Sequence, residues 1–278
     1  MKCLLLILLV SQIYSKVSFD PSQIVSKIDL NLKFTDSESR PQSLGGYFNE
    51  APQAVHLVQF VYFNCGSICS PFINETIFSL RAIQPDLILG RDFTLNTISI
   101  NPTESSSLAA DKKQNYLKEY HSQFGQSASS ASPASPANRT NLSHLTSEQI
   151  KSWRFLVSDS LTVSRITSSL GFFFDPIGDK DYNHKAVMFF VNTQGDLIDF
   201  IKGPMLYPLE VKMKVWGIQG GVSSIIKMKY YKWFYTKNET AGKYELITVK
   251  LVVLSGITFI LFILFLFRMK RIVTSKRN

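Results

Sequence analysis

The sequence predicts an α/β fold with a mixed central sheet and helices on both faces, followed by one membrane-spanning helix. Strand-like and helix-like patterns alternate through an exported body at residues 16–225. An almost continuous apolar run at 55–63 is typical of a strand covered on both faces. A long uncharged apolar stretch at 247–267 predicts the membrane helix.

The individual elements follow from periodicity and from capping residues. We expect, in chain order, a strand at 55–63, a helix at 71–83, a strand at 93–100, a helix at 109–120, a strand at 154–157, a helix at 160–170, a hairpin of strands at 186–191 and 196–201, and a helix at 208–216. Asp159 or Ser160 can cap the helix that begins at 160, and Gly171 suits its left-handed C-terminal position. This order implies a central mixed sheet with helices on both faces.

Both ends of the chain carry apolar segments, and they differ in length. Residues 1–15 combine one early lysine, a short apolar run and small residues, which is typical of a secretory signal peptide; an uncleaved anchor is the alternative. Residues 247–267 can cross about 30 Å of hydrocarbon. The basic tail at 268–278 contains no acid and is expected to stay cytoplasmic, with residues 226–246 as a juxtamembrane segment on the other side.

Charge and composition exclude several classes of function. The net charge of +9 is concentrated around the membrane segment, so it indicates anionic lipid headgroups and not nucleic acid. The chain has no nucleophile elbow, P-loop or dinucleotide-binding fingerprint, and we assign no catalytic residue. The Ser-, Ala- and Pro-rich stretch at 126–141 is expected to be a flexible surface insertion. An aromatic cluster at 230–235 can rest on the bilayer interface or pack on the body.

Cys65 and Cys69 are the most informative residues of the body, since the one other cysteine, Cys3, lies in the predicted signal peptide. Four-residue spacing on a helix brings two Cβ atoms to about 5–6 Å. Such a pair can form a structural disulfide, act as a redox couple or chelate a soft metal. Two thiolates suit Cu(I), whereas structural zinc usually takes four ligands.

A third metal ligand has to come from elsewhere in the chain. The histidines are His56, His121, His144 and His184. The residues alone favour a surface or structural role for each of them. Three acids, Asp175, Asp179 and Asp181, precede His184, and a solvated loop explains them better than a cation site does.

Several motifs together resemble the Sco/SenC family of thioredoxin-fold proteins. They are the run at 60–65 with Cys69, Ser-Ile-Asn-Pro-Thr-Glu at 99–104 with the stretch 109–117, Trp-Arg-Phe-Leu at 153–156, Tyr-Asn-His at 182–184 and Asn-Thr-Gln-Gly at 192–195. Their order and spacing match over roughly residues 30–220. The segment at 230–244, before a C-terminal span, resembles a bacterial subgroup.

The resemblance implies a thioredoxin-like fold and a copper ion bound by Cys65, Cys69 and His184. The family helps to assemble the dinuclear copper (CuA) centre of cytochrome c oxidase, by delivering copper, by reducing the cysteines of the oxidase's copper-binding subunit, or both. It therefore implies a copper chaperone, with a thiol–disulfide oxidoreductase as the alternative, in the inner membrane with its body in the periplasm. Other copper carriers or thiol reductants are further partners that it implies.

Two other functions of the cysteine pair remain open at this point. A thiol–disulfide oxidoreductase would use Cys65 and Cys69 through mixed disulfides with client cysteines. A stable disulfide without metal would give the pair a structural role only.

The sequence departs from the family pattern near the pair. Gly66 follows Cys65 where the family usually has Pro, and Pro71 comes one residue late. Asn101 stands where the family often has an acid. The loop is therefore expected to be more flexible, with altered copper affinity, and the chain lacks the negative charge of that acid.

Overall fold

The computed structural model describes residues 19–65, 69–84, 86–127, 145–178, 181–238 and 243–275. The predicted signal peptide and most of the insertion at 126–141 lie outside these residues, as do His144 and Asp179. The chain divides into two compact units, the first reaching Gln219 and the second beginning at Gly220. The predicted boundary at 225 falls within a helix of the second unit and stays a prediction.

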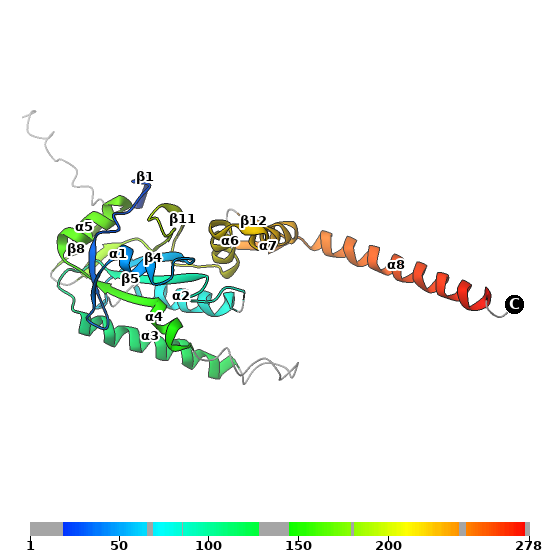
Figure 1. Cartoon of the computed structure of the whole chain (residues 1–278), viewed down its shortest axis with the longest axis horizontal. Coiled ribbons are helices and arrows are strands. Elements are labelled where there is room, and N and C mark those ends of the chain that lie inside the picture. Colours follow the sequence, from blue (N-terminus) through cyan, green and yellow to red (C-terminus); the bar gives the residue numbers. More distant parts are fainter. Residues whose placement is uncertain are drawn as a thin grey trace, which may run out of the picture. The chain divides into compact units, whose positions relative to one another are not determined.

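A seven-stranded mixed sheet forms the centre of the first unit, in the order β11-β10-β4-β5-β6-β2-β3 (Figure 1). Neighbouring strands β4, β5 and β6 are parallel, and the strands outside them are antiparallel. The strands are β2 (Lys33–Asp36), β3 (Pro41–Ser43), β4 (Val55–Val61), β5 (Phe93–Ser99), β6 (Trp153–Val157), β10 (Val187–Val191) and β11 (Leu197–Lys202).

The order of elements around β4 is the thioredoxin-like topology. Strand β4 leads through α2 (Cys69–Ile83) to its parallel neighbour β5. The later hairpin of β10 and β11 lies on the other side of β4, and α6 (Pro208–Gln219) follows it. The predicted mixed sheet and its fold class are therefore confirmed.

Both faces of the sheet are covered, as the sequence predicts. The side chain of Gln59 accepts a hydrogen bond from Thr76 of α2, whereas the neighbouring Phe60 contacts Phe172 of β7 on the opposite face. Figure 1 shows α3 and α5 on opposite sides of the sheet. Every residue of β4 and β5 is buried. The covering elements are α1 (Leu44–Asn49), α3 (Ser106–Ser127), α4 (Ser147–Ser152), α5 (Ser160–Ser169) and the ribbon of β1 (Phe19–Ile24) with β7 (Leu170–Phe172).

The predicted helix at 160–170 shows why capping residues are reliable signals. Asp159 caps α5 by accepting a hydrogen bond from the Thr162 N–H at 2.9 Å, and Gly171 has a φ of +60° just beyond the helix. A side chain on Gly171 would meet the backbone oxygen of Asp20. The helix predicted at 109–120 is longer in the structure, and α3 includes His121.

His56 has the structural role that the residues alone favour. It is fully buried in β4, with its ring stacked on Phe48 at a centroid separation of 3.8 Å. Nδ1 lies 2.8 Å from Oγ1 of Thr94, and Nε2 has no partner within the described chain. Burial, followed by the charge of Arg154, lowers the pKa of His56 from 6.5 to about 3.

We expect acid to destabilise the fold through His56. His56 binds a proton near pH 6.5 in the unfolded chain and only near pH 3 in the folded chain. The stability that the neutral His56 contributes at pH 7 is therefore lost as the pH falls from 6.5 towards 3. The slope is at most about 1.4 kcal/mol per pH unit. Urea unfolding at several pH values measures it. His56→Phe retains the ring stack and should show a shallower slope; equal slopes would contradict the assignment.

The second unit holds a helix, a hairpin and the predicted membrane segment. These are α7 (Gly221–Phe234), β12 (Tyr235–Asn238), β13 (Lys243–Leu246) and α8 (Thr248–Ser275). Within α8, Thr248–Arg268 is long and apolar enough to cross a membrane, and none of its most apolar part is buried. This candidate span starts and ends one residue later than the predicted 247–267.

Candidate metal centre

Three separate segments of the chain converge at one edge of the sheet. Since β4 and β5 are parallel, the residues after them, which include Cys65 and Glu104, leave the sheet at the same edge. Strand β10 runs antiparallel to β4, with Met188 opposite Gln59, so His184 before β10 reaches that edge as well. Carboxyl ends of strands are where open α/β sheets place their ligand sites.

The two cysteines flank the start of α2. Cys65 is buried, and its N–H donates to the carbonyl oxygen of Tyr62 at 3.2 Å. Cys69 is the first residue of α2, a position at which the helix N-terminus stabilises a thiolate. Residues 66–68, which include Gly66, and the side chain of Cys69 lie outside the described part. Among the described side chains, no three from His, Cys, Asp and Glu gather as a metal site.

His184 is the last residue of β9 (Asp181–His184), and its imidazole is buried. Nδ1 lies 3.0 Å from the carbonyl oxygen of Lys185. Because a carbonyl only accepts, Nδ1 carries the proton and the lone pair of the neutral ring is on Nε2. Burial lowers the pKa of His184, and the hydrogen bond to Lys185 opposes this effect. The lowered pKa favours the neutral imidazole, which is the form that metals bind.

Tyr62 contacts the backbone of Cys65 and the ring of His184. Its carbonyl oxygen accepts the Cys65 N–H, and its ring centroid lies 5.9 Å from that of His184. Its hydroxyl lies 3.3 Å from Oδ1 of Asp181. Tyr62 therefore ties the cysteine segment to the hairpin of β8 (Phe174–Ile177) and β9. Neither this hairpin nor the bridging role of Tyr62 follows from the sequence pattern.

Glu104 is a second residue that the sequence reasoning missed as part of this region. It is a buried acid whose carboxylate accepts three hydrogen bonds: Oε2 from the Phe63 N–H at 2.8 Å and from the Ser99 hydroxyl at 2.6 Å, and Oε1 from the Asn64 N–H at 2.9 Å. These bonds fix the backbone immediately before Cys65. Burial and then the charge of Glu104 raise the pKa of Tyr182, so the carboxylate also acts on β9.

The uncharged side chain of Asn101 accepts three hydrogen bonds in this region. Its Oδ1 accepts hydrogen bonds from the N–H of Thr103 at 3.0 Å, from the Thr103 hydroxyl at 2.8 Å and from the Tyr182 hydroxyl at 3.3 Å. An amide oxygen serves all three donors without a negative charge. Asn101 therefore holds the turn after β5 and reaches the same hairpin as Tyr62.

The acids before His184 do not gather around it in the described residues. Asp175 pairs with Asn183 across the β8–β9 hairpin, and Asp181 pairs with Ile177. Asp181 also accepts the hydrogen bond of Tyr62. This arrangement favours the structural interpretation of the acids over a cation site.

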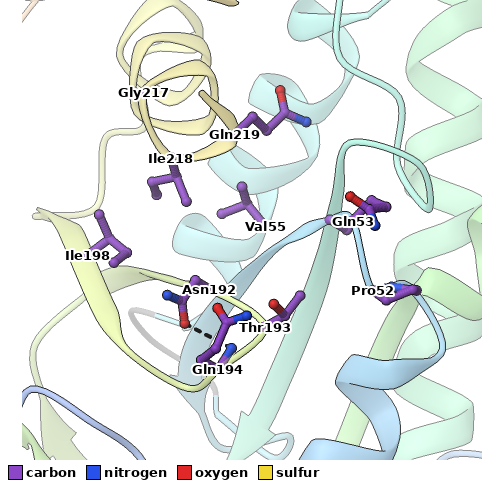
Figure 2. Close-up of a pocket in the computed structure, with 11 residues that line it drawn as sticks. Pro52, Gln53, Val55, Asn192, Thr193, Gln194, Ile198, Gly217, Ile218 and Gln219 are labelled. Carbon is purple, nitrogen blue, oxygen red and sulfur yellow. Dashed lines mark hydrogen bonds between the residues drawn. The ribbon is translucent and has the colours of Figure 1, made fainter. Parts of the chain in front are cut away.

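Described residues line cavities at both ends of the sheet. One of about 430 Å³ lies where β5 and β6 end and is lined by residues that include Pro102, Glu104 and Asp159. The other, of about 350 Å³, lies at the opposite end, where Val55 begins β4 (Figure 2). Amide, hydroxyl and apolar side chains line this second cavity, and its lining contains no thiol, imidazole or carboxylate that would hold copper.

Comparisons with known proteins give similarities in structure only. No family model matches the chain, and no curated protein matches it. A putative electron transfer protein from Aquifex aeolicus VF5 is 18% identical with a TM-score of 0.48, over 68% of this chain and 89% of that chain. Arabidopsis thaliana ScoI with copper bound is 12% identical with a TM-score of 0.46, over 72% and 99%. Bradyrhizobium japonicum ScoI with copper bound is 17% identical with a TM-score of 0.44, over 68% and 97%.

The fold class rests on the strand order of this chain, and the chemistry of the site rests on its own residues.

Proposed function

We propose that this chain belongs to the Sco/SenC family and is a membrane-tethered copper chaperone for the CuA centre of cytochrome c oxidase. The contact of Tyr62 with both the Cys65 backbone and the His184 ring carries the proposal, because it brings two of the three expected ligand residues to one edge of the sheet. Two thiolates and a neutral imidazole suit copper. Copper is then the cargo, and the copper-binding subunit of the oxidase is the client.

The three expected ligand residues have distinct roles in this proposal. Cys65 and Cys69 supply the thiolates, and Cys69 is the first residue of α2. His184 supplies a neutral nitrogen in a fixed tautomer. Incoming thiolates of the client would replace Cys65 and Cys69 as ligands, with copper passing between the two proteins.

The second unit supports a tether for the chaperone. The candidate span in α8 would cross the inner membrane once, with the body at 16–225 in the periplasm and the basic tail at 268–278 in the cytoplasm. The proposed signal peptide at 1–15 directs this export. Tethering beside a membrane-bound client raises the effective concentration of the two partners.

The direct test is an anaerobic Cu(I) competition titration of the reduced full chain in detergent. We expect one tightly bound copper ion per chain. If the folded, reduced chain fails to compete with a Cu(I) chelator, the chaperone proposal is wrong.

His184→Ala should weaken Cu(II) binding more than Cu(I) binding, since imidazole is a good ligand for Cu(II) and the thiolates alone hold Cu(I). We expect a loss of about tenfold to a hundredfold for Cu(II). The electronic absorption and electron paramagnetic resonance spectra of the Cu(II) form should change as a nitrogen ligand is lost. His121→Ala, in α3, is the matched control and should leave the spectra unchanged. Identical spectra for His184→Ala would exclude His184 as a ligand.

A thiol–disulfide oxidoreductase is the second candidate, favoured by the position of Cys69 at the start of α2. In this function, one thiolate attacks a client disulfide and the second releases the reduced client, so two electrons pass to the client and the pair becomes a disulfide. An external thiol reductant would then restore the pair. Rapid reduction of an oxidised client peptide by a chain that binds no copper would support this function over the first.

A further inference from the structure

The helix α7 in the second unit presents large apolar side chains to the outside. Val222 is 76% exposed, Ile226 62%, Tyr230 58% and Trp233 47%. At about 100° per residue these four positions fall within an arc of roughly 80° on one side of the helix. An exposed apolar stripe of this kind marks a contact with a partner or a membrane.

The charges of α7 are all positive. Lys227, Lys229 and Lys232 are exposed, and the helix contains no acidic residue. By helical spacing, Lys227 lies on one side of the apolar arc and Lys229 on the other, roughly 60° and 20° from its edges. Long lysine stems can lie along an apolar surface while their ammonium groups reach the polar phase.

The C-terminal end of α7 is tied to the first turn of the candidate span. Nζ of Lys250 donates to the carbonyl oxygen of Trp233 at 2.7 Å and lies 5.4 Å from the centre of its ring. The N–H of Ile247 donates to the carbonyl oxygen of Phe234 at 2.7 Å. If Thr248–Arg268 crosses a membrane, Trp233 therefore lies at the level where the hydrocarbon begins, the level at which Trp and Tyr are enriched.

We infer that α7 is an interfacial helix that lies on an anionic bilayer surface beside the start of α8. Its apolar arc enters the boundary between headgroups and acyl chains, and its lysines meet anionic headgroups. Lipid fits this face better than an acidic protein partner or a second copy does, because the end of α7 is hydrogen-bonded to the start of the span and the helix combines an apolar arc with flanking lysines. This inference depends on the span and is independent of copper.

The test places a tryptophan on each side of α7 in the full chain, reconstituted in vesicles of mixed zwitterionic and anionic phospholipids. The parent is Trp233→Phe, and the two derivatives add Ile226→Trp in the arc or Ser224→Trp on the opposite side. Subtracting the parent signal isolates the added fluorophore. Phospholipids brominated near the headgroup should quench the tryptophan at 226 and spare the one at 224, which aqueous acrylamide should quench instead.

Two further variants separate the possible occupants of this face. Ile257→Trp in α8 should be quenched by bromines deep in the chains, and its failure would overturn the span and the inference together. Replacing Lys227, Lys229 and Lys232 with Gln should reduce quenching at position 226, since each lysine contributes a factor of about five near an anionic surface. Equal quenching at 224 and 226 would overturn the inference. So would protection of position 226 from both quenchers, which would indicate a second copy or the rest of the chain.

Discussion

Cys65→Ser should abolish tight Cu(I) binding, with a loss in affinity of roughly a thousandfold or more, about 4 kcal/mol. A serine hydroxyl keeps its proton at neutral pH and is a hard ligand, so it cannot replace a thiolate toward a soft ion. Cys69→Ser should have the same effect, because a single thiolate with His184 leaves Cu(I) without its preferred sulfur pair. Competition against a chromophoric Cu(I) chelator, under anaerobic and reducing conditions, measures both.

The chain supplies its own matched control for this experiment. In the full chain with residues 1–15 retained, Cys3→Ser makes the same chemical change in the predicted signal peptide and should leave the affinity unaltered. The exchange at Cys65 removes little volume from a buried position, so the unfolding midpoint should move little and the loss can be attributed to the ligand. Unchanged Cu(I) affinity in Cys65→Ser would exclude this residue as a ligand and leave the pair to redox or structural chemistry.

The central elements could be predicted because their local patterns agree with their burial. Strand β4 reads as one apolar run, and all of its residues are indeed buried. Asp159 and Gly171 mark the ends of α5 because a capping carboxylate and a positive φ impose local requirements on residue type. Cys65 could be placed at a strand's carboxyl end for the same reason, since the strand before it is unambiguous.

The remaining elements lack such local signals. Strand β8 contains Pro176 and is partly exposed, so neither its period nor its composition indicates a strand; its pairing with β9 stabilises it. The longer α3 continues past the predicted end because polar residues such as His121 and Ser122 fit an exposed helix as well as a loop. These elements depend on contacts between residues distant in the sequence.

The site was predictable only in part for a related reason. His184 is distinguished from the other histidines by resemblance, and its burial beside Tyr62 becomes visible only in three dimensions. Glu104 reads as one more acid in a polar turn. Its partners, the N–H groups of Phe63 and Asn64, lie about forty positions earlier in the chain, and no sequence pattern connects them.

Glu104→Gln should destabilise the reduced, copper-free chain by about 2–4 kcal/mol. The carboxylate accepts from two backbone N–H groups and one hydroxyl, and two of these donors belong to buried residues. A glutamine keeps the shape but turns one acceptor oxygen into a donor, so at least one N–H of Phe63 or Asn64 faces another donor. Urea unfolding followed by the fluorescence of the buried Trp153 and Trp216 measures the loss.

Under conditions where Glu104→Gln is fully folded, the variant should bind Cu(I) about tenfold more weakly. The backbone at Phe63 and Asn64, which directly precedes Cys65, is then free to move, and part of the binding energy is used to order this backbone. Glu148→Gln, at an exposed carboxylate whose Lys151 partner lies at 3.6 Å, is the matched control and should change neither quantity measurably. A destabilised Glu104→Gln with wild-type copper affinity would make Glu104 a structural residue only. A loss in both quantities would make it the residue that positions Cys65 for copper.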